Sequence, residues 1–371
     1  MPCNYQSLPH LGIQTLSPYV PGKPIDALKR EMGLTDIIKL ASNENPFGCS
    51  PQVYKALAAM TAEDIAHYPA YHLHPLKLAL AEKWSISEDR ITLSNGSDFI
   101  FGLLLMLFAL GSGKHMLSHD KAFSTYMIQA QTLNVPFVLS PLLDNWEVDI
   151  PALIAACTDK TALIFLANPN NPTGILVSHA AIEKLLQSIP ETTILVLDEA
   201  YYEFAYDIED KSTLKLLDSH PNLVITRTFS KAYGLAGLRL GYAFASIEIT
   251  GLLQRIQLPF TINQAAMNAA NEALKDQSFL ENTIQQTHAG REQMRQGLEA
   301  LGLYALPSAC NFLTFDCRRN GLGIYQALLE CGIIVRPLHP YQMADFLRVS
   351  IGKAKDNVRF LDALAKILKN L

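Results

Sequence analysis

The chain of 371 residues contains little charge. Asp, Glu, Lys and Arg make up 18% of the residues, against a usual share of about a quarter. The formal net charge is −5 and the sequence has no block of basic residues, which excludes nucleic acid as the expected partner. Because so few charges do not cover the surface of a large monomer, we expect an oligomer that acts on small molecules.

Long apolar runs and paired cysteines are also missing. No stretch reaches the ~18 apolar residues of a membrane span, and residues 99–110 fit a buried helix instead. The first twelve residues have neither a basic nor an apolar segment, so we expect no secretory signal. The six cysteines are scattered without a Cys-x-x-Cys pair, which in a chain of this size indicates reduced thiols. These absences predict a cytoplasmic protein without membrane contact.

Strand-like and helix-like segments alternate between residues 91 and 245. Short runs rich in apolar and β-branched residues are separated by longer segments with helical spacing. The predicted strands are residues 91–93, 115–117, 135–139, 161–166, 193–197, 223–226 and 240–243. This alternation predicts an α/β fold with a mostly parallel, seven-stranded sheet that helices cover on both faces.

The two ends of the chain differ from this middle part. Residues 1–45 are rich in proline and turn residues apart from a helix-like stretch at 25–32, and we expect an arm that joins the smaller domain and a dimer contact. Residues 46–258 form the predicted large domain. Residues 259–371 combine a long helical stretch, short strand-like segments and a terminal helix, which predicts a smaller α+β domain.

Polar side chains follow three of the predicted strands at the point where each strand ends. Residues 168–174, 198–201 and 228–231 supply an amide, a carboxylate with a phenol, and a lysine. Ligands of parallel α/β sheets bind beyond the carboxyl ends of the strands. We therefore expect the three clusters to converge on one pocket.

Each cluster also has a structural interpretation. Residues 170–174 alone make up a loop of turn-forming residues. The apolar run before Asp198 is also typical of a nucleoside triphosphatase, but residues 111–114 lack the earlier glycine of a phosphate loop and His115 follows them. Lys231 alone is most simply a solvated lysine. In surroundings nearly free of charge, however, its ammonium form is disfavoured and it becomes an amine nucleophile.

The three clusters together resemble the signature of pyridoxal-phosphate-dependent aminotransferases of fold type I. The matching segments are Asn-Pro-Thr-Gly at 171–174, Asp-Glu-Ala-Tyr at 198–201, and residues 230–241. Residues 16–19, 42–48, 96–98, 259–263 and 333–337 resemble the histidinol-phosphate aminotransferase branch, so the resemblance spans nearly the whole chain. It implies transfer of an amino group between histidinol phosphate and 2-oxoglutarate, giving imidazole-acetol phosphate and glutamate, in histidine biosynthesis.

The resemblance implies pyridoxal 5′-phosphate as the cofactor, bound by the large domain. Lys231 is expected to bind it covalently and then to move the substrate's Cα proton as a base. Asp198 is expected to pair with the ring nitrogen and keep it protonated. Tyr201 and Asn171 are expected to hydrogen-bond the phenolic oxygen, and Phe123 to stack on the ring, although Phe123 also fits a core position.

The phosphate of the cofactor needs donors of its own. Ser97 and Asp98 follow a predicted strand and open the apolar helix, so their N–H groups and the helix dipole favour an anion. A helix cap and a surface arginine are the alternative interpretations of this set. Tyr68 resembles the tyrosine that reaches the phosphate from the partner subunit, which implies a homodimer with shared active sites. The other residues expected to bind the cofactor are Thr228, Ser230 and Arg239.

Arginines are expected to recognise the substrates. Arg348 resembles the arginine that binds the α-carboxylate, and Arg336 resembles a second anion-binding arginine, although each also fits a structural ion pair. A guanidinium fork suits carboxylate and phosphate alike, so one pocket would accept glutamate and a phosphorylated amine in turn. Asn43 and Tyr19 are the other expected substrate contacts. We expect no metal site, because the histidines of residues 67–74 have no complementary ligand cluster.

Other functions on the same scaffold remain open. An aromatic amino-acid aminotransferase or an amino-acid decarboxylase would use the same cofactor residues. A cofactor-sensing transcriptional regulator would need a DNA-binding domain, and an arm of about 45 residues without a basic helix leaves no room for one.

Overall fold

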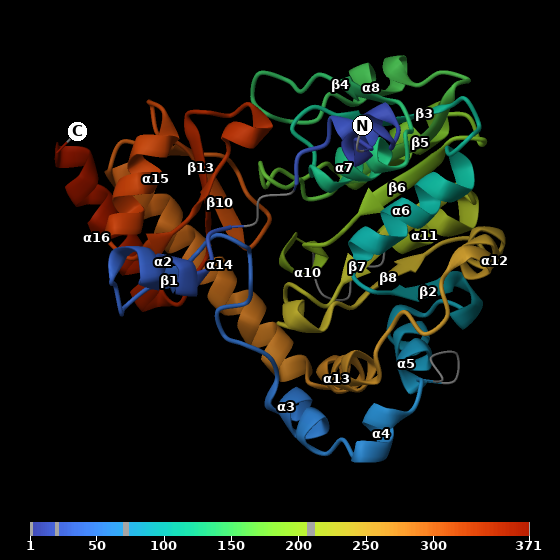
Figure 1. Ribbon diagram of the computed structural model, residues 1–371, viewed down its shortest axis with the longest axis horizontal. Helices are drawn as coiled ribbons and strands as arrows, with labels where there is room; N and C mark the ends of the chain where they lie inside the picture. Colours follow the sequence, from blue (N-terminus) through green and yellow to red (C-terminus); the bar gives the residue numbers. More distant parts are fainter. Residues whose placement is uncertain (1–2, 19–21, 70–73, 206–211, 371) are drawn as a thin grey trace.

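A computed structural model describes residues 3–18, 22–69, 74–205 and 212–370 and contains a large sheet of seven strands (Figure 1). These strands are β2 (Ile91–Ser94), β3 (His115–His119), β4 (Phe137–Ser140), β5 (Thr161–Ala167), β6 (Ile194–Asp198), β7 (Leu223–Thr228) and β8 (Gly241–Phe244). Their order is β2-β8-β7-β6-β5-β3-β4, with β8 antiparallel to both neighbours and parallel pairing from β7 to β4. Each run predicted from the sequence overlaps one of these strands, and the mostly parallel α/β fold is confirmed.

The central strands β5, β6 and β7 are buried along their whole length because helices cover both faces of the sheet. All seven residues of β5 are buried. Its side chains alternate: Leu163 and Phe165 join one core cluster, whereas Ile164 and Leu166 join the other. Helices α6 (Ser97–Phe108), α7 (Thr125–Thr132) and α12 (Ile247–Ile256) pack on the first face. Helices α5 (Pro75–Trp84), α8 (Ile150–Ala156), α9 (His179–Ser188) and α13 (Gln264–Lys275) pack on the second.

A second, smaller sheet lies beside the large one. Its strands are β9 (Tyr304–Ala305), β10 (Phe312–Asp316), β12 (Arg336–Pro337) and β13 (Phe346–Ser350), in the order β12-β13-β10-β9. It packs with α14 (Gln277–Ala300), α15 (Gly321–Glu330) and α16 (Ala354–Asn370). Near the N-terminal end, β1 (Ile38–Lys39) pairs in parallel with β11 (Ile333–Ile334), so the arm lies against the smaller unit (Figure 1).

Helix α13 shows where the two units divide. The boundary predicted from the sequence, between residues 258 and 259, would place α13 in the smaller unit. Its side chains instead pack on α3 (Pro51–Ala58) and α5, and they join the core beneath the large sheet. The 24-residue helix α14 then runs from α13 to the small sheet (Figure 1). We therefore propose that the division lies near the start of α14, because burial of the alanine-rich face of α13 needs the large unit.

The remaining elements are short. They are η1 (Tyr5–Ser7), α1 (Leu11–Gln14), α2 (Ile25–Met32), α4 (Ala62–Ala66), η3 (Glu88–Arg90), α10 (Tyr202–Ala205), α11 (Ser212–Ser219), η4 (Ala236–Leu238) and η5 (His339–Tyr341). No helix among the described residues is long and apolar enough to cross a bilayer. All six cysteines have free thiols.

Candidate active site

A cavity lies beyond the carboxyl ends of β5, β6 and β7 and is closed on its other side by residues of β12 and β13. All three polar clusters predicted from the sequence contribute to its wall. The predicted residues that line it are Asn43, Ser97, Asp98, Phe123, Asn171, Asp198, Tyr201, Thr228, Ser230, Lys231, Arg239, Arg336 and Arg348. Their convergence follows from the parallel strands, which end at one edge of the sheet.

Asp198 is the last residue of β6 and is 5% exposed. The Tyr126 hydroxyl donates to its Oδ2 at 2.6 Å, and the Thr226 hydroxyl donates to its Oδ1 at 3.2 Å. Burial raises the pKa of this carboxyl to about 6, and the two hydroxyl donors oppose that rise. The site therefore holds a fixed carboxylate that favours a cation or a protonated nitrogen beside it.

A buried ion pair anchors the strand ends behind Asp198. Arg227 donates from Nε to Glu199 Oε2 at 2.8 Å, and both side chains are fully buried. The guanidinium carbon also lies 3.5 Å from the centre of the Tyr202 ring. Because a buried charge without its partner is costly, this pair holds the ends of β6 and β7 in one arrangement.

Lys231 faces the cavity from the loop after β7. Its Nζ lies 3.5 Å from the Ser42 carbonyl oxygen and 5.6 Å from the centre of the Tyr201 ring. Burial and, as a second cause, the positive charge of Arg348 lower the pKa of this amine to about 8. A neutral, nucleophilic amine is therefore accessible near physiological pH.

Tyr201 and Asn171 lie on the wall beside Lys231, each held by a second polar side chain. Asn43 donates from Nδ2 to the Tyr201 hydroxyl oxygen at 2.9 Å. Asn171 accepts a hydrogen bond from Arg348, whose other terminal nitrogen donates to the Ala41 carbonyl oxygen at 2.8 Å. Burial raises the pKa of the Tyr201 phenol, so this group stays protonated.

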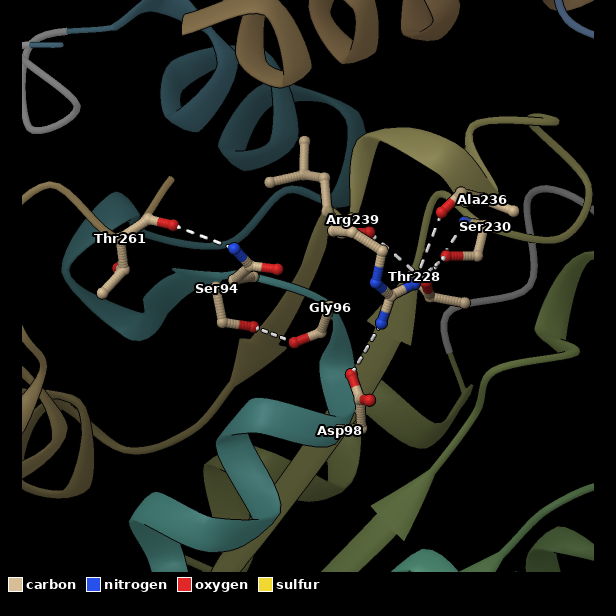
Figure 2. Close-up of polar contacts among 10 residues, drawn as sticks. Ser94, Gly96, Asp98, Thr228, Ser230, Ala236, Arg239 and Thr261 are labelled. Atoms are coloured by element: carbon tan, nitrogen blue, oxygen red, sulfur yellow. Dashed lines mark hydrogen bonds and ion pairs between the residues drawn. The ribbon is translucent and has the colours of Figure 1, made fainter. Parts of the chain in front are cut away.

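The side chains of Asp98, Ser230 and Arg239 and the N-terminus of α6 form a small cup where β2 leads into α6 (Figure 2). Arg239 donates to Asp98 Oδ1 at 3.0 Å and lies 3.5 Å from Ser230 Oγ. Gly96, at φ 79°, precedes the helix, and a Cβ there would come within 2.5 Å of Arg239. The N-terminus of α6 has no side-chain cap, so its N–H groups are available to an anion.

Two arginines lie next to each other on neighbouring strands of the small sheet. Arg336 of β12 is the cross-strand partner of Arg348 of β13, and both line the cavity. Like charges placed opposite each other in a sheet repel unless an anion lies between or near them. This arrangement favours anionic substrate groups.

Phe123 lies at the cavity wall and packs against the core on the α6 side of the large sheet. Its ring meets Tyr126 edge to face, with the ring centres 5.7 Å apart. Tyr126 and Tyr341, which also belongs to the site, were missed from the sequence. Tyr126 follows Phe123 by three residues in the segment that leads into α7, and this nearness is the signal that could have identified it. Tyr341 lines the cavity from η5, and its hydroxyl lies 3.3 Å from Ser124 Oγ.

One predicted site residue, Tyr68, lies away from this cavity, and another falls outside the described residues. Tyr68 is 79% exposed and stacks on Phe260, with the ring centres 4.4 Å apart. Its predicted contact with a partner's cofactor stays a prediction. Tyr19 lies outside the described residues. Among the described residues, no group of His, Cys, Asp or Glu side chains could hold a metal ion.

Comparison with known families identifies this arrangement. The sequence model of the family described as aminotransferase class I and II matches residues 35–364, a range that includes both sheets and the whole cavity wall from β1 onward. The chain belongs to this family. The family signature inferred from residues 171–174, 198–201 and 230–241 is thereby confirmed.

Relatives within the family match the chain over almost its full length. The protein named histidinol-phosphate aminotransferase 2 of Legionella pneumophila (strain Lens) is 51% identical over 364 residues, which are 98% of this chain and 99% of the relative. The protein of that name from Pseudomonas aeruginosa is 42% identical over 367 residues, with coverage of 98% and 99%. The crystal structure of histidinol-phosphate aminotransferase from Sinorhizobium meliloti in complex with pyridoxal-5′-phosphate aligns with a TM-score of 0.89 at 30% identity, covering 98% of both chains.

Proposed function

We propose that the chain is a pyridoxal-phosphate-dependent transaminase that interconverts histidinol phosphate plus 2-oxoglutarate and imidazole-acetol phosphate plus glutamate. The observation that carries the proposal is that one cavity contains three positively charged or hydrogen-bond-donating groups, each suited to bind an anion. These are the cup of Arg239 and the α6 N-terminus, together with Arg336 and Arg348. One anion site suits a cofactor phosphate, and the other two suit a substrate phosphate and a carboxylate.

The residues of the cavity fit pyridoxal 5′-phosphate in their chemistry. A side chain at position 96 would collide with Asp98 and Arg239, so the glycine lets this arginine approach the uncapped N-terminus of α6, where both supply donors for a phosphate. Asp198 supplies a buried carboxylate for a protonated ring nitrogen, and Lys231 supplies an amine. Phe123 offers an aromatic face to the same cavity. When bound, the cofactor supplies an electron sink for the electrons of the broken Cα–H bond.

Lys231 has two roles in the proposed reaction. As a nucleophile its amine would hold the cofactor covalently, and as a base the same amine would accept the substrate's Cα proton. Both roles need the neutral form, which the lowered pKa of about 8 makes available. Asp198 supports these steps with a carboxylate and Tyr201 with a neutral hydroxyl, and burial and hydrogen bonds keep both groups in fixed positions.

The two arginines distinguish the two substrates. Arg348 binds the α-carboxylate of glutamate or 2-oxoglutarate, and Arg336 binds the phosphate of histidinol phosphate, which lacks a carboxylate. Asn43 and Asn171 lie on the same wall. The two substrates occupy the cavity in turn, so the proposal predicts ping-pong kinetics.

The proposed assembly is a homodimer in the cytoplasm, with each site completed by its neighbour. Two features support it: the low charge of the chain and the exposed, stacked Tyr68 and Phe260. Tyr68 is the side chain that would reach the partner's cofactor phosphate. The free thiols of the six cysteines fit a reducing compartment.

A single half-reaction tests the proposed function. The purified holoenzyme should be yellow, and histidinol phosphate alone should bleach its visible absorbance. Subsequent 2-oxoglutarate should restore the colour, because the amino group then leaves the enzyme. Borohydride should fix the cofactor on a peptide that contains Lys231. A label on another lysine, or bleaching by phenylalanine or tyrosine but not by histidinol phosphate, would overturn the proposal.

A further inference from the structure

Asn43 is held more tightly than a substrate contact requires. It is 1% exposed and has a φ of 55°, in the left-handed region that Asn tolerates better than most residues. Its N–H donates to Ser350 Oγ at 2.8 Å, and its carbonyl oxygen accepts from Asn311 Nδ2 at 3.0 Å. Its side chain bonds Ser350 on one side and Tyr201 on the other, each at 2.9 Å. All the polar groups of this residue are therefore engaged.

The Ser350 hydroxyl determines which way the Asn43 amide faces. Because Ser350 Oγ already accepts the Asn43 N–H, its own proton is free to donate to Asn43 Oδ1. Turning the amide over would present Nδ2 to Ser350 and leave the serine proton buried without an acceptor, which is costly. The oxygen of the amide therefore faces Ser350, and its NH₂ group faces Tyr201.

The Asn43 amide in turn determines the direction of the Tyr201 proton. A hydroxyl oxygen that accepts from Asn43 Nδ2 cannot also point its proton at that nitrogen. The Tyr201 O–H is thus directed away from Asn43, and Tyr201 lines the cavity. With the amide turned over, Oδ1 would instead attract the proton and remove a donor from the cavity.

We propose that Ser350 and Asn43 are positioning residues that direct the Tyr201 proton at the phenolic oxygen of the bound cofactor. The inference rests on the proposed function, which supplies that oxygen. Ser350 lies on β13, two residues beyond Arg348, so the strand that carries the substrate arginine also orients the phenol. Neither side chain takes part in proton transfer. Each acts by fixing the polarity of a hydrogen bond.

The pH titration of the holoenzyme's visible absorbance tests this inference. A donor at the phenolic oxygen stabilises its negative charge and lowers the midpoint of the colour change. Ser350→Ala should raise the midpoint by about half a pH unit or more, since one buried hydrogen bond is weakened. Asn43→Gly, which keeps the positive φ and adds no charge, should shift it in the same direction. Ser308→Ala is the matched control, because the Ser308 hydroxyl donates to the Phe312 carbonyl oxygen outside this network and its loss should not move the midpoint.

A double-mutant cycle separates this role from general damage to the site. In a Tyr201→Phe background, Ser350→Ala should cause no further shift, because the hydroxyl that it orients is absent. An unchanged midpoint in Ser350→Ala, or an equal shift with and without the Tyr201 hydroxyl, would overturn the inference while leaving the proposed function intact. A holoenzyme without visible absorbance from a cofactor on Lys231 would overturn the proposed function itself.

Discussion

At the scale of single residues, the site depends on groups whose ionisation is set by burial. Lys231 combines a lowered pKa with a position beside Arg348 and Tyr201. Asp198 combines a raised pKa with two hydroxyl donors. The sequence predicts both residues from their places at strand ends. It also predicts the direction of the Lys231 shift, but not the raised pKa of Asp198 or the contribution of Arg348 to the Lys231 pKa, because burial and the approach of Arg348 depend on the packing of the small sheet.

The reactivity of Lys231 should follow its lowered pKa. The neutral amine is the nucleophile, so labelling of cofactor-free protein should accelerate as the pH rises and should reach half its maximum near pH 8. Arg348→Leu should move this midpoint upward, because a nearby positive charge is removed. The measurement is the initial rate of borohydride-stable labelling by pyridoxal 5′-phosphate, relative to a free lysine derivative. A midpoint equal to that of the free lysine derivative would contradict the account.

Asp198→Asn should leave the fold intact and abolish most of the activity. The amide is nearly isosteric but cannot stabilise a protonated ring nitrogen, and kcat should fall by about 100-fold or more. Activity within about threefold of wild type would show that Asp198 only caps the end of its strand.

The same substitution has an expected effect on stability in the absence of cofactor. The folded carboxyl, with its pKa of about 6, holds a proton that the unfolded chain releases near 3.8. The free energy of unfolding of the wild type should therefore fall, relative to Asp198→Asn, as the pH rises from about 4 to about 6. Denaturant titrations at the two pH values measure this difference. A difference that grows in the opposite direction would contradict the raised pKa.

At the scale of elements, the pairing of β12 with β13 makes the substrate site. The sequence predicts the segment that forms β13, and it singles out Arg336 and Arg348 separately. Their register as direct cross-strand partners appears only in the structure, because the turn that joins the two strands fixes it. The same limit applies to Tyr341, which reaches the cavity through the η5 turn, and to the placement of α13 in the larger core.

Arg336→Leu should separate the two kinds of amino donor. A charge-assisted contact of roughly 1.5 to 3 kcal/mol with the substrate phosphate is lost, so kcat/KM for histidinol phosphate should fall about tenfold to a hundredfold. Kinetics with phenylalanine or tyrosine as the donor, whose single carboxylate relies on Arg348, should change much less. An equal loss for both donors would show that Arg336 supports the site as a whole.

At the scale of the whole molecule, the proposed active sites need a dimer, because each site uses Tyr68 of the neighbouring chain. Low charge predicts an oligomer from composition alone, but the composition does not say which surface is covered. Tyr68 stands 79% exposed outside its own chain's cavity, as a residue that serves a neighbour would. The α/β fold and the three polar clusters of the cavity wall were predictable because they follow from strand order and strand ends. The other predicted wall residues, such as Phe123, Arg336 and Arg348, come from the resemblance to the aminotransferase family. The position of Tyr68 relative to a partner depends on a second chain, so one sequence does not predict it.

Mixing two inactive variants tests the shared site. Lys231→Ala lacks the reactive amine, and Tyr68→Phe lacks the phosphate contact. Subunit exchange between them should create dimers in which one site carries neither lesion, so activity should recover to about a quarter of the wild-type level in an equal mixture. Sedimentation of the wild type as a monomer, or no recovery when exchange is demonstrated, would contradict a shared site.

The choice of amino donor by the wild-type enzyme tests the central claim most directly. The measurement is kcat/KM for histidinol phosphate, phenylalanine and tyrosine with 2-oxoglutarate as the acceptor, in one preparation of holoenzyme. Because the proposed function gives Arg336 a charge-assisted contact with the substrate phosphate, histidinol phosphate should be preferred by about tenfold or more. A preference for phenylalanine or tyrosine would contradict the account and would identify an aromatic aminotransferase.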